Sequence, residues 1–106
     1  MLTNLYVGLS RYGRGEKLSA ARFIQHFAAD RLPELAELIE DEVPAPKDIF
    51  AYERRFEQRF PGLAKELPAF IQGYEHSRES AGAILGYLER RFEANPAMAL
   101  AIRGLI

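Results

Sequence analysis

Few side chains in this sequence have the types and spacing that catalysis or metal binding requires. The chain has no cysteine and two histidines, His26 and His76. A helical di-metal site would place a glutamate three residues before each histidine, but Phe23 and Gly73 stand there. Ser77 follows His76 directly, and adjacent side chains diverge on a helix. We therefore predict no catalytic residue and no metal ligand in this chain.

One arginine–histidine pair resembles a catalytic motif without matching it. Helical ribonucleases of the HEPN type carry an arginine and a histidine that are separated by a slightly longer stretch. Here only three residues lie between Arg22 and His26. On a helix these two side chains would share one face, one turn apart, as an ordinary surface pair does. A HEPN-like ribonuclease therefore stays as a weaker alternative.

A turn rich in glycine and basic residues is a candidate for contact with an anion. Gly13, Arg14 and Gly15 are too few for a phosphate-binding loop, and no Gly-Lys-Ser/Thr follows them. Arg11 and Lys17 flank the turn, and arginine recognises phosphate and carboxylate groups well. The main expected role of this segment is to join two helices.

Composition argues against several classes of function. The chain has 106 residues and a net charge of −1, so we expect no nucleic-acid partner and no attraction to anionic lipid. Its long uncharged stretches, Leu2–Ser10 and Ala94–Ile102, fall well short of the roughly 20 residues that cross a bilayer. The N-terminus does not have the pattern of a signal peptide. We expect a cytoplasmic location.

Helical spacing of apolar residues places the glycine-rich turn between two helices. The first helix is predicted over Thr3–Tyr12. Glu16 opens the second, where an acid is favoured by the helix dipole. Its apolar residues keep one phase to Ile39 although Pro33 removes a hydrogen bond. We expect one helix bent near Asp30–Pro33 rather than two coaxial helices with Asp30 capping the second.

Prolines and glycines divide the remainder of the chain. Val43-Pro44-Ala45-Pro46 predicts an extended connection. The expected elements after it are a short helix from Asp48 to Phe60 ended by Pro61-Gly62, a turn at most over Leu63–Leu67, a long helix from Pro68 to Phe92, and a last helix over Ala97–Arg103 capped by Asn95. Arg54, Arg55 and Arg59 alternate with glutamates, which predicts a solvated helix face.

The predicted fold is all-α, because β-branched residues are scarce. We expect one domain, residues 1–106, built as an up-and-down four-helix-type bundle with one extra short helix. Gly82 and Gly86 would share one helix face and allow close approach of another helix. The apolar start and the ending Gly104-Leu105-Ile106 favour a fragment or an accessory subunit of a longer protein. These features also predict a homodimer.

Three segments carry a resemblance to a known family: Asn4–Leu9, Arg14–Ala20 and Arg54–Pro61. The order of a helix, a Gly-Glu turn, a long helix, a short helix ending near Phe-Pro and another long helix is similar to the C-terminal helical domain of lincosamide- and aminoglycoside-type nucleotidyltransferases. That resemblance implies a substrate-binding and dimerisation domain of an antibiotic-resistance transferase. It also implies a separate catalytic domain as partner, and this other domain would bind the nucleoside triphosphate and Mg²⁺.

The substrate-binding residues that we predict lie at the turn and on the preceding helix. They are Tyr6, Tyr12, Arg14 and Glu16. Arg14 would contact an anion, while Glu16 would either contact a cationic or hydroxylated acceptor or cap the second helix. No cofactor is expected in this chain itself. The alternative function is a free-standing helical interaction module, antitoxin-like or HEPN-like, with no small-molecule role.

Overall fold

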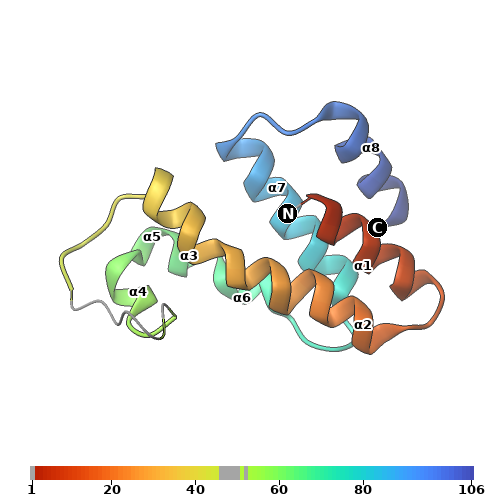
Figure 1. Ribbon diagram of the computed structural model, residues 1–106, viewed down its shortest axis with the longest axis horizontal. Helices are drawn as coiled ribbons and strands as arrows, with labels where there is room; N and C mark the ends of the chain where they lie inside the picture. The colour runs from red at the N-terminus through yellow and green to blue at the C-terminus, as the bar shows by residue number, and fades with distance from the viewer. Residues whose placement is uncertain (1, 46–50, 52) are drawn as a thin grey trace.

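Helices make up the regular structure of the part of the chain that the computed structural model describes, residues 2–45, 51 and 53–106. No strand occurs in these ranges, which confirms the all-α prediction. The elements are α1 (Leu2–Gly13), α2 (Lys17–Ala21), the π-helical turn η1 (Arg22–His26), α3 (Phe27–Ile39), α4 (Phe56–Arg59), α5 (Pro61–Ala64), α6 (Leu67–Phe70), α7 (Ser77–Arg91) and α8 (Pro96–Leu105). Figure 1 shows α1, α2 and α8 toward one end of the molecule and α4 and α5 toward the other, with α3 running from the first end toward the second.

The first helix lies where its apolar spacing predicted it. It runs over Leu2–Gly13, and its buried face carries Leu5 and Leu9. The chain then turns at Gly15, whose φ of +84° lies in the left-handed region that glycine adopts without a steric cost. This turn sets α2 against α1.

The second helix is one continuous segment, as predicted, and it contains a π-helical turn that the spacing did not predict, while the bend near Asp30–Pro33 stays a prediction. Pro33 sits inside α3, and the helix continues through it to Ile39. The departure from α-helical hydrogen bonding is the π-helical turn η1 at Arg22–His26, nearer the start of the segment. Asp30 is an interior residue of α3 and caps no separate helix. The hydrophobic phase could not reveal this, because one inserted π turn shifts the phase by only one residue.

The predicted long helix from Pro68 to Phe92 is wrong in its first third. α6 ends at Phe70, residues 71–76 form a loop, and α7 begins at Ser77. Gly73 has a φ of +106°, which an α-helix does not allow. Its backbone N–H and C=O are both bonded to Gln25 of η1, at 2.8 and 2.7 Å. A contact distant in sequence thus replaces the helical hydrogen bonds that the spacing suggested.

The middle of the chain differs from its prediction in detail. The expected cap Asp48 lies outside the described residues. The helix that was to end at Phe60 is the single turn α4, preceded by Arg55 in the left-handed region with a φ of +61°. Pro61, which was expected to end it, instead opens α5 as its first residue. Proline suits that position because its fixed φ matches the helix and its missing N–H has no helical partner there.

The last helix confirms its predicted cap. Oδ1 of Asn95 accepts a hydrogen bond of 3.1 Å from the backbone N–H of Met98, and Pro96 follows as the first helical residue. Gly82 of α7 lies beside the C-terminal end of α8, since a Cβ at position 82 would stand 3.8 Å from Cδ1 of Ile106. A Cβ at Gly86, the second residue of the predicted small face, would have no such neighbour within 4 Å.

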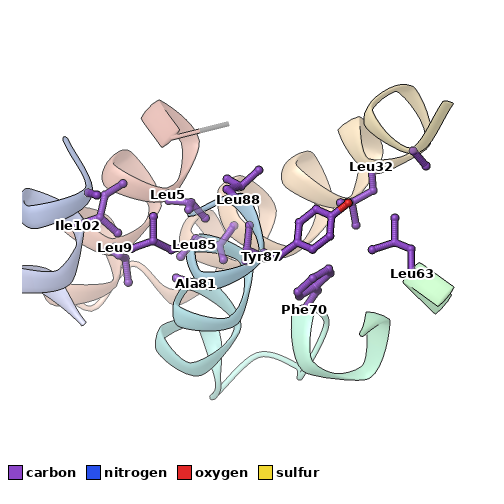
Figure 2. Packing of buried hydrophobic residues seen from close by; sticks show 14 of the residues in the cluster. Leu5, Leu9, Leu32, Leu63, Phe70, Ala81, Leu85, Tyr87, Leu88 and Ile102 are labelled. Atoms are coloured by element: carbon purple, nitrogen blue, oxygen red, sulfur yellow. The ribbon is translucent and has the colours of Figure 1, made fainter. Parts of the chain in front are cut away.

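A single apolar cluster joins all parts of the molecule. Leu5 and Leu9 of α1 meet Leu85 of α7 and Ile102 of α8 within it (Figure 2). Tyr87 packs edge-on against Phe70 at a centroid distance of 5.6 Å and connects α7 to α6. Its hydroxyl donates a 2.7 Å hydrogen bond to Glu40. Burial, together with this bond, raises the pKa of Tyr87 well above its usual value, so the phenol is neutral.

Candidate functional site

The candidate site is a groove of about 530 Å³ beside the turn between α1 and α2. We call it the arginine groove. It is lined by Arg11, Leu18, Ser19, Arg22, Phe23, His26 and Asp30. These residues come from α1, α2, η1 and α3, so the groove exists only because the turn at Gly15 folds the second helix back on the first.

Arg11 is held in place on the α1 side of this groove. Its Nη1 donates a hydrogen bond of 2.7 Å to Oγ of Ser19 on α2. Its guanidinium carbon lies 4.5 Å from the centroid of the Phe23 ring, a cation–π distance. These two contacts fix the plane of the guanidinium, and the nitrogens other than Nη1 are left for a ligand. Less conformational entropy is therefore lost when Arg11 binds an anion.

Arg22 and His26 provide the cationic side of the groove on the second helix. Both side chains are exposed. Within the described part of the chain, neither of them forms a hydrogen bond or an ion pair with another residue. Asp30 is the one acid among the lining residues, against the two arginines. The formal charge of the groove is therefore positive even when His26 is neutral.

The π-helical turn supplies both the groove and its support. Arg22, Phe23 and His26 of η1 line the groove, while Ile24 and Gln25 of the same turn are buried, at 0% and 2% exposure. Ile24 lies against Gly8 of α1, where a Cβ would approach its Cγ1 to 2.5 Å. Only glycine at position 8 leaves room for this contact. The turn is thus anchored on its inner face while its outer face is open.

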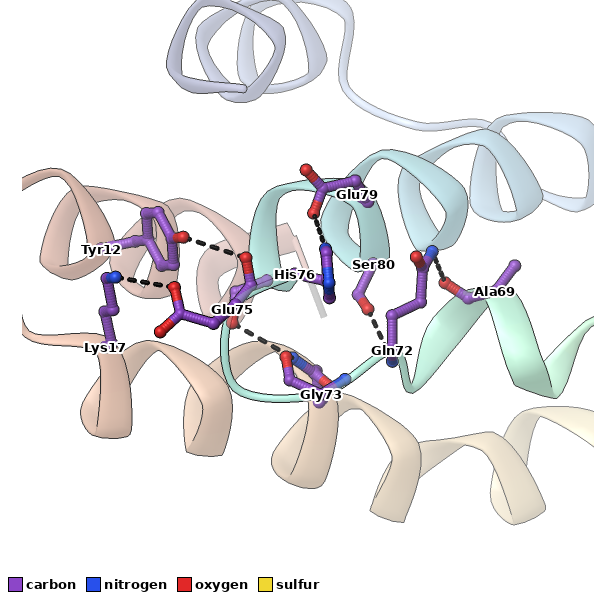
Figure 3. A network of polar contacts seen from close by, with 11 residues as sticks. Tyr12, Lys17, Ala69, Gln72, Gly73, Glu75, His76, Glu79 and Ser80 are labelled. Atoms are coloured by element: carbon purple, nitrogen blue, oxygen red, sulfur yellow. Dashed lines mark hydrogen bonds and ion pairs between the residues drawn. The ribbon is translucent and has the colours of Figure 1, made fainter.

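Gln25 also ties the 71–76 loop to the back of the site. Its amide bonds the backbone of Gly73 in both directions, and its Nε2 donates a further 3.1 Å bond to Oγ of Ser77. Figure 3 shows the same loop held from α1 and α2 at Glu75. There the Tyr12 hydroxyl donates to the backbone oxygen of Glu75 at 3.1 Å, and Nζ of Lys17 bonds its carboxylate at 2.8 Å.

The four predicted substrate-binding residues do not form one cluster with the groove. Nε of Arg14 bonds the Glu16 carboxylate at 2.8 Å, and neither residue lines the groove. Glu16 is the N-cap residue of α2, as predicted, but its side chain makes no capping hydrogen bond. The carboxylate is drawn instead to the guanidinium two residues earlier. A role of Arg14 and Glu16 in substrate binding stays a prediction.

The two predicted tyrosines have different surroundings. The Tyr12 ring lies between two cations, with Lys17 at 5.8 Å and Arg78 at 4.8 Å from its centroid. The glutamate partner of Lys17 raises the pKa of that amine through their hydrogen bond. Tyr6 is 42% exposed on α1. Tyr12 therefore belongs to the attachment of the 71–76 loop, and Tyr6 is the more accessible of the two.

For Arg59 the prediction of a solvated side chain is wrong. The alternating charges predicted a solvated face, but its side chain is 1% exposed. Its guanidinium donates 2.8 Å hydrogen bonds to Glu37 of α3 and to Glu42. Both carboxylates raise the pKa of Arg59 and keep it charged. The group fastens α4 to the end of α3 and lies outside the arginine groove.

The sequence contained part of the signal for the groove. Arg22, His26 and Asp30 are spaced four apart and so share a helix face. Arg11 and Ser19 complete the groove from the opposite helix, and no local spacing predicts that contact. Among the described residues, no group of three or more histidine, aspartate or glutamate side chains is arranged to hold a metal ion.

Comparison with known proteins adds no assignment. No protein-family model, curated protein or solved structure matches this chain. Within the described ranges, no helix has the length and apolar character needed to cross a bilayer.

Proposed function

We propose that this chain is a non-catalytic helical binding domain whose arginine groove holds the anionic part of a ligand, a phosphate or a carboxylate. The observation that supports this most is the convergence of Arg11 and Arg22 from two different helices on one groove. Guanidinium groups match such anions because they present two parallel N–H donors to two oxygens.

The chemistry of the groove supports binding rather than catalysis. Ser19 is its one hydroxyl, and its Oγ accepts the hydrogen bond from Arg11. A nucleophilic serine needs a base that removes its proton, but its hydrogen-bond partner Arg11 is a donor only. Within the described residues Ser19 forms no side-chain hydrogen bond with His26 or Asp30, the two possible bases that line the groove. The apolar side chains Leu18 and Phe23 lie beside the charges. A ligand with an anionic group attached to an apolar body fits this lining.

From the resemblance to nucleotidyltransferases, we extend the proposal from anion binding to a role within a larger enzyme. In that setting the chain is the helical domain that helps to bind the acceptor substrate and dimerises the enzyme. Its catalytic partner domain supplies the nucleotide and Mg²⁺ chemistry. We further propose that four segments form an up-and-down bundle: α1, the α2–α3 segment, α7 and α8. A gene in which a Gly-Ser…Asp-x-Asp segment precedes this sequence would support the role within a larger enzyme, and a gene without one would count against it.

Calorimetric titration with inorganic pyrophosphate tests anion binding directly. Arg22→Ala should weaken the affinity at least about tenfold, since a hydrogen bond to a charged group is worth about 1.5–3 kcal/mol. Lys65→Ala removes the same charge at an exposed site outside the groove and should change the affinity less than about twofold. Equal losses in both variants would show that pyrophosphate responds to net charge alone, and the proposal would fail.

A second candidate function rests on the fact that Arg22 and His26 line the same groove. An arginine can stabilise charge on a phosphate and a histidine can transfer protons, and metal-independent cleavage of RNA uses both roles. Incubation with a mixed-sequence RNA in the presence of a chelator tests this reading. Cleavage that is abolished by Arg22→Ala would support a ribonuclease, and intact RNA would exclude it.

A further inference from the structure

A second cleft, of about 210 Å³, lies between α3 and the α4–α6 region. We call it the acidic cleft. Its apolar lining includes Phe56 of α4 and Ile71 just after α6, and three carboxylates, Asp30, Glu53 and Glu57, complete it. A water molecule takes up about 30 Å³ of liquid volume, so the cleft holds roughly seven waters or one large apolar side chain.

The carboxylates of the acidic cleft are available to a partner. All three side chains are exposed. Within the described ranges, none of them forms an ion pair with a basic residue. This differs from most other acids that the structure describes, such as Glu75, Glu66 and Glu89, which pair with a lysine or an arginine. The cleft therefore combines an apolar interior with three carboxylates that no ion pair among the described residues neutralises.

We propose that the acidic cleft docks a basic amphipathic helix of a partner protein. Charge complementarity selects this occupant. An apolar anchor side chain would enter between Phe56 and Ile71, and lysines or arginines one turn away would meet the carboxylates, as in helix-in-groove recognition. An anionic membrane is disfavoured, because the carboxylates repel its surface. The site is distinct from the arginine groove, although Asp30 borders both.

Ile71 is suited to contact such an anchor. It is 47% exposed although it is a large apolar residue at the edge of the cleft. Docking would cover this surface, which is worth about 25 cal/mol per Å² of buried apolar area. A residue exposed to this extent also tolerates polar substitution without loss of the fold.

Two synthetic peptides of about fourteen residues test the proposal, an amphipathic leucine–lysine helix and a leucine–glutamate helix with the same leucine positions. Fluorescence anisotropy should show binding of the lysine peptide and at least tenfold weaker binding of the glutamate peptide. NMR titration should shift the signals of Phe56 and Ile71. Equal binding of the two peptides, or no shift at these residues, would overturn the proposal.

Matched variants separate the cleft from general attraction between charges. Glu53→Gln combined with Glu57→Gln should weaken the lysine peptide at least fivefold, and Ile71→Ser should weaken it similarly. Asp41→Asn combined with Glu93→Gln removes two exposed charges outside the cleft and should leave binding within twofold. If the control pair weakens binding equally, the cleft is not the site. Self-association that is abolished by Ile71→Ser would assign the cleft to a second copy instead, and binding to anionic vesicles would assign it to a membrane.

Discussion

The contact between Gly8 and Ile24 determines how η1 is seated on α1, and it can be tested by one methyl group. A Cβ at position 8 would lie 2.5 Å from Cγ1 of Ile24 and 3.2 Å from Cβ of Phe23. Both neighbours belong to the π-helical turn that carries Arg22 and His26. Gly8→Ala therefore has to displace the turn that forms one side of the arginine groove.

Two opposing effects determine how much Gly8→Ala changes the free energy of unfolding. Overpacking of a filled interior costs about 1–3 kcal/mol, whereas alanine gains up to about 1 kcal/mol over glycine in a helix. Gly86→Ala in α7 is the matched control, because a Cβ there has no atom within 4 Å. The helical gain is common to both variants and cancels in their comparison. Gly8→Ala should thus be about 1–3 kcal/mol less stable than Gly86→Ala.

Urea unfolding followed by circular dichroism measures this difference. For a domain of this size each kcal/mol corresponds to a change in Tm of about 4–8 °C, so thermal melts provide a second reading. Gly8→Ala should also weaken pyrophosphate binding, while Gly86→Ala should not. Unfolding free energies that agree within about 0.3 kcal/mol would refute the close contact and, with it, the seating of η1.

Other regions of the fold give further predictions. Gln25→Leu removes three hydrogen bonds at the 71–76 loop and should cost about 1.5–4.5 kcal/mol, at about 0.5–1.5 kcal/mol per bond. Unchanged amide exchange at Gly73 would contradict this. Arg59→Met leaves two half-exposed carboxylates unpaired and should cost at least about 1 kcal/mol in chemical denaturation, below the 3–5 of a fully buried pair. The hydrogen bond from Arg103 lowers the pKa of Glu89. The stability that this hydrogen bond contributes is therefore present above the unfolded-state pKa of Glu89 and is lost as the pH falls through its folded-state pKa. Accordingly, Glu89→Gln should destabilise the protein near neutral pH but not in strong acid. Light scattering tests the predicted homodimer, and a strict monomer at high concentration would contradict it.

The helices that the sequence predicted well are those with local signals. Asn95-Pro96 is a cap followed by a first-turn proline, and both act as their types suggest. The apolar spacing of α1 has the same local character. The 71–76 loop could not be predicted in this way, because the partner that compensates Gly73 is Gln25, far away in the chain. Local propensity gave way there to a tertiary contact.

The candidate site likewise depends on tertiary contacts. Spacing placed Arg22 and His26 on one face and placed Arg11 near the turn, but only folding brings these residues to one groove. Arg14 is of a residue type that binds anions, yet its guanidinium bonds Glu16. Likewise, the burial of Arg59 depends on Glu37 and Glu42 from another segment. Residue type predicted the chemistry available, and tertiary structure determined which residues supply it.

NMR of the arginine side chains during titration with inorganic pyrophosphate is the most direct test of the arginine groove. The Nε–Hε signals of Arg11 and Arg22 should shift in a saturable manner with one common dissociation constant. The signal of Arg14 should stay in place, because its Nε bonds Glu16. A shift of Arg14 alone, with Arg11 and Arg22 unchanged, would contradict the groove as the anion site and would favour the turn instead.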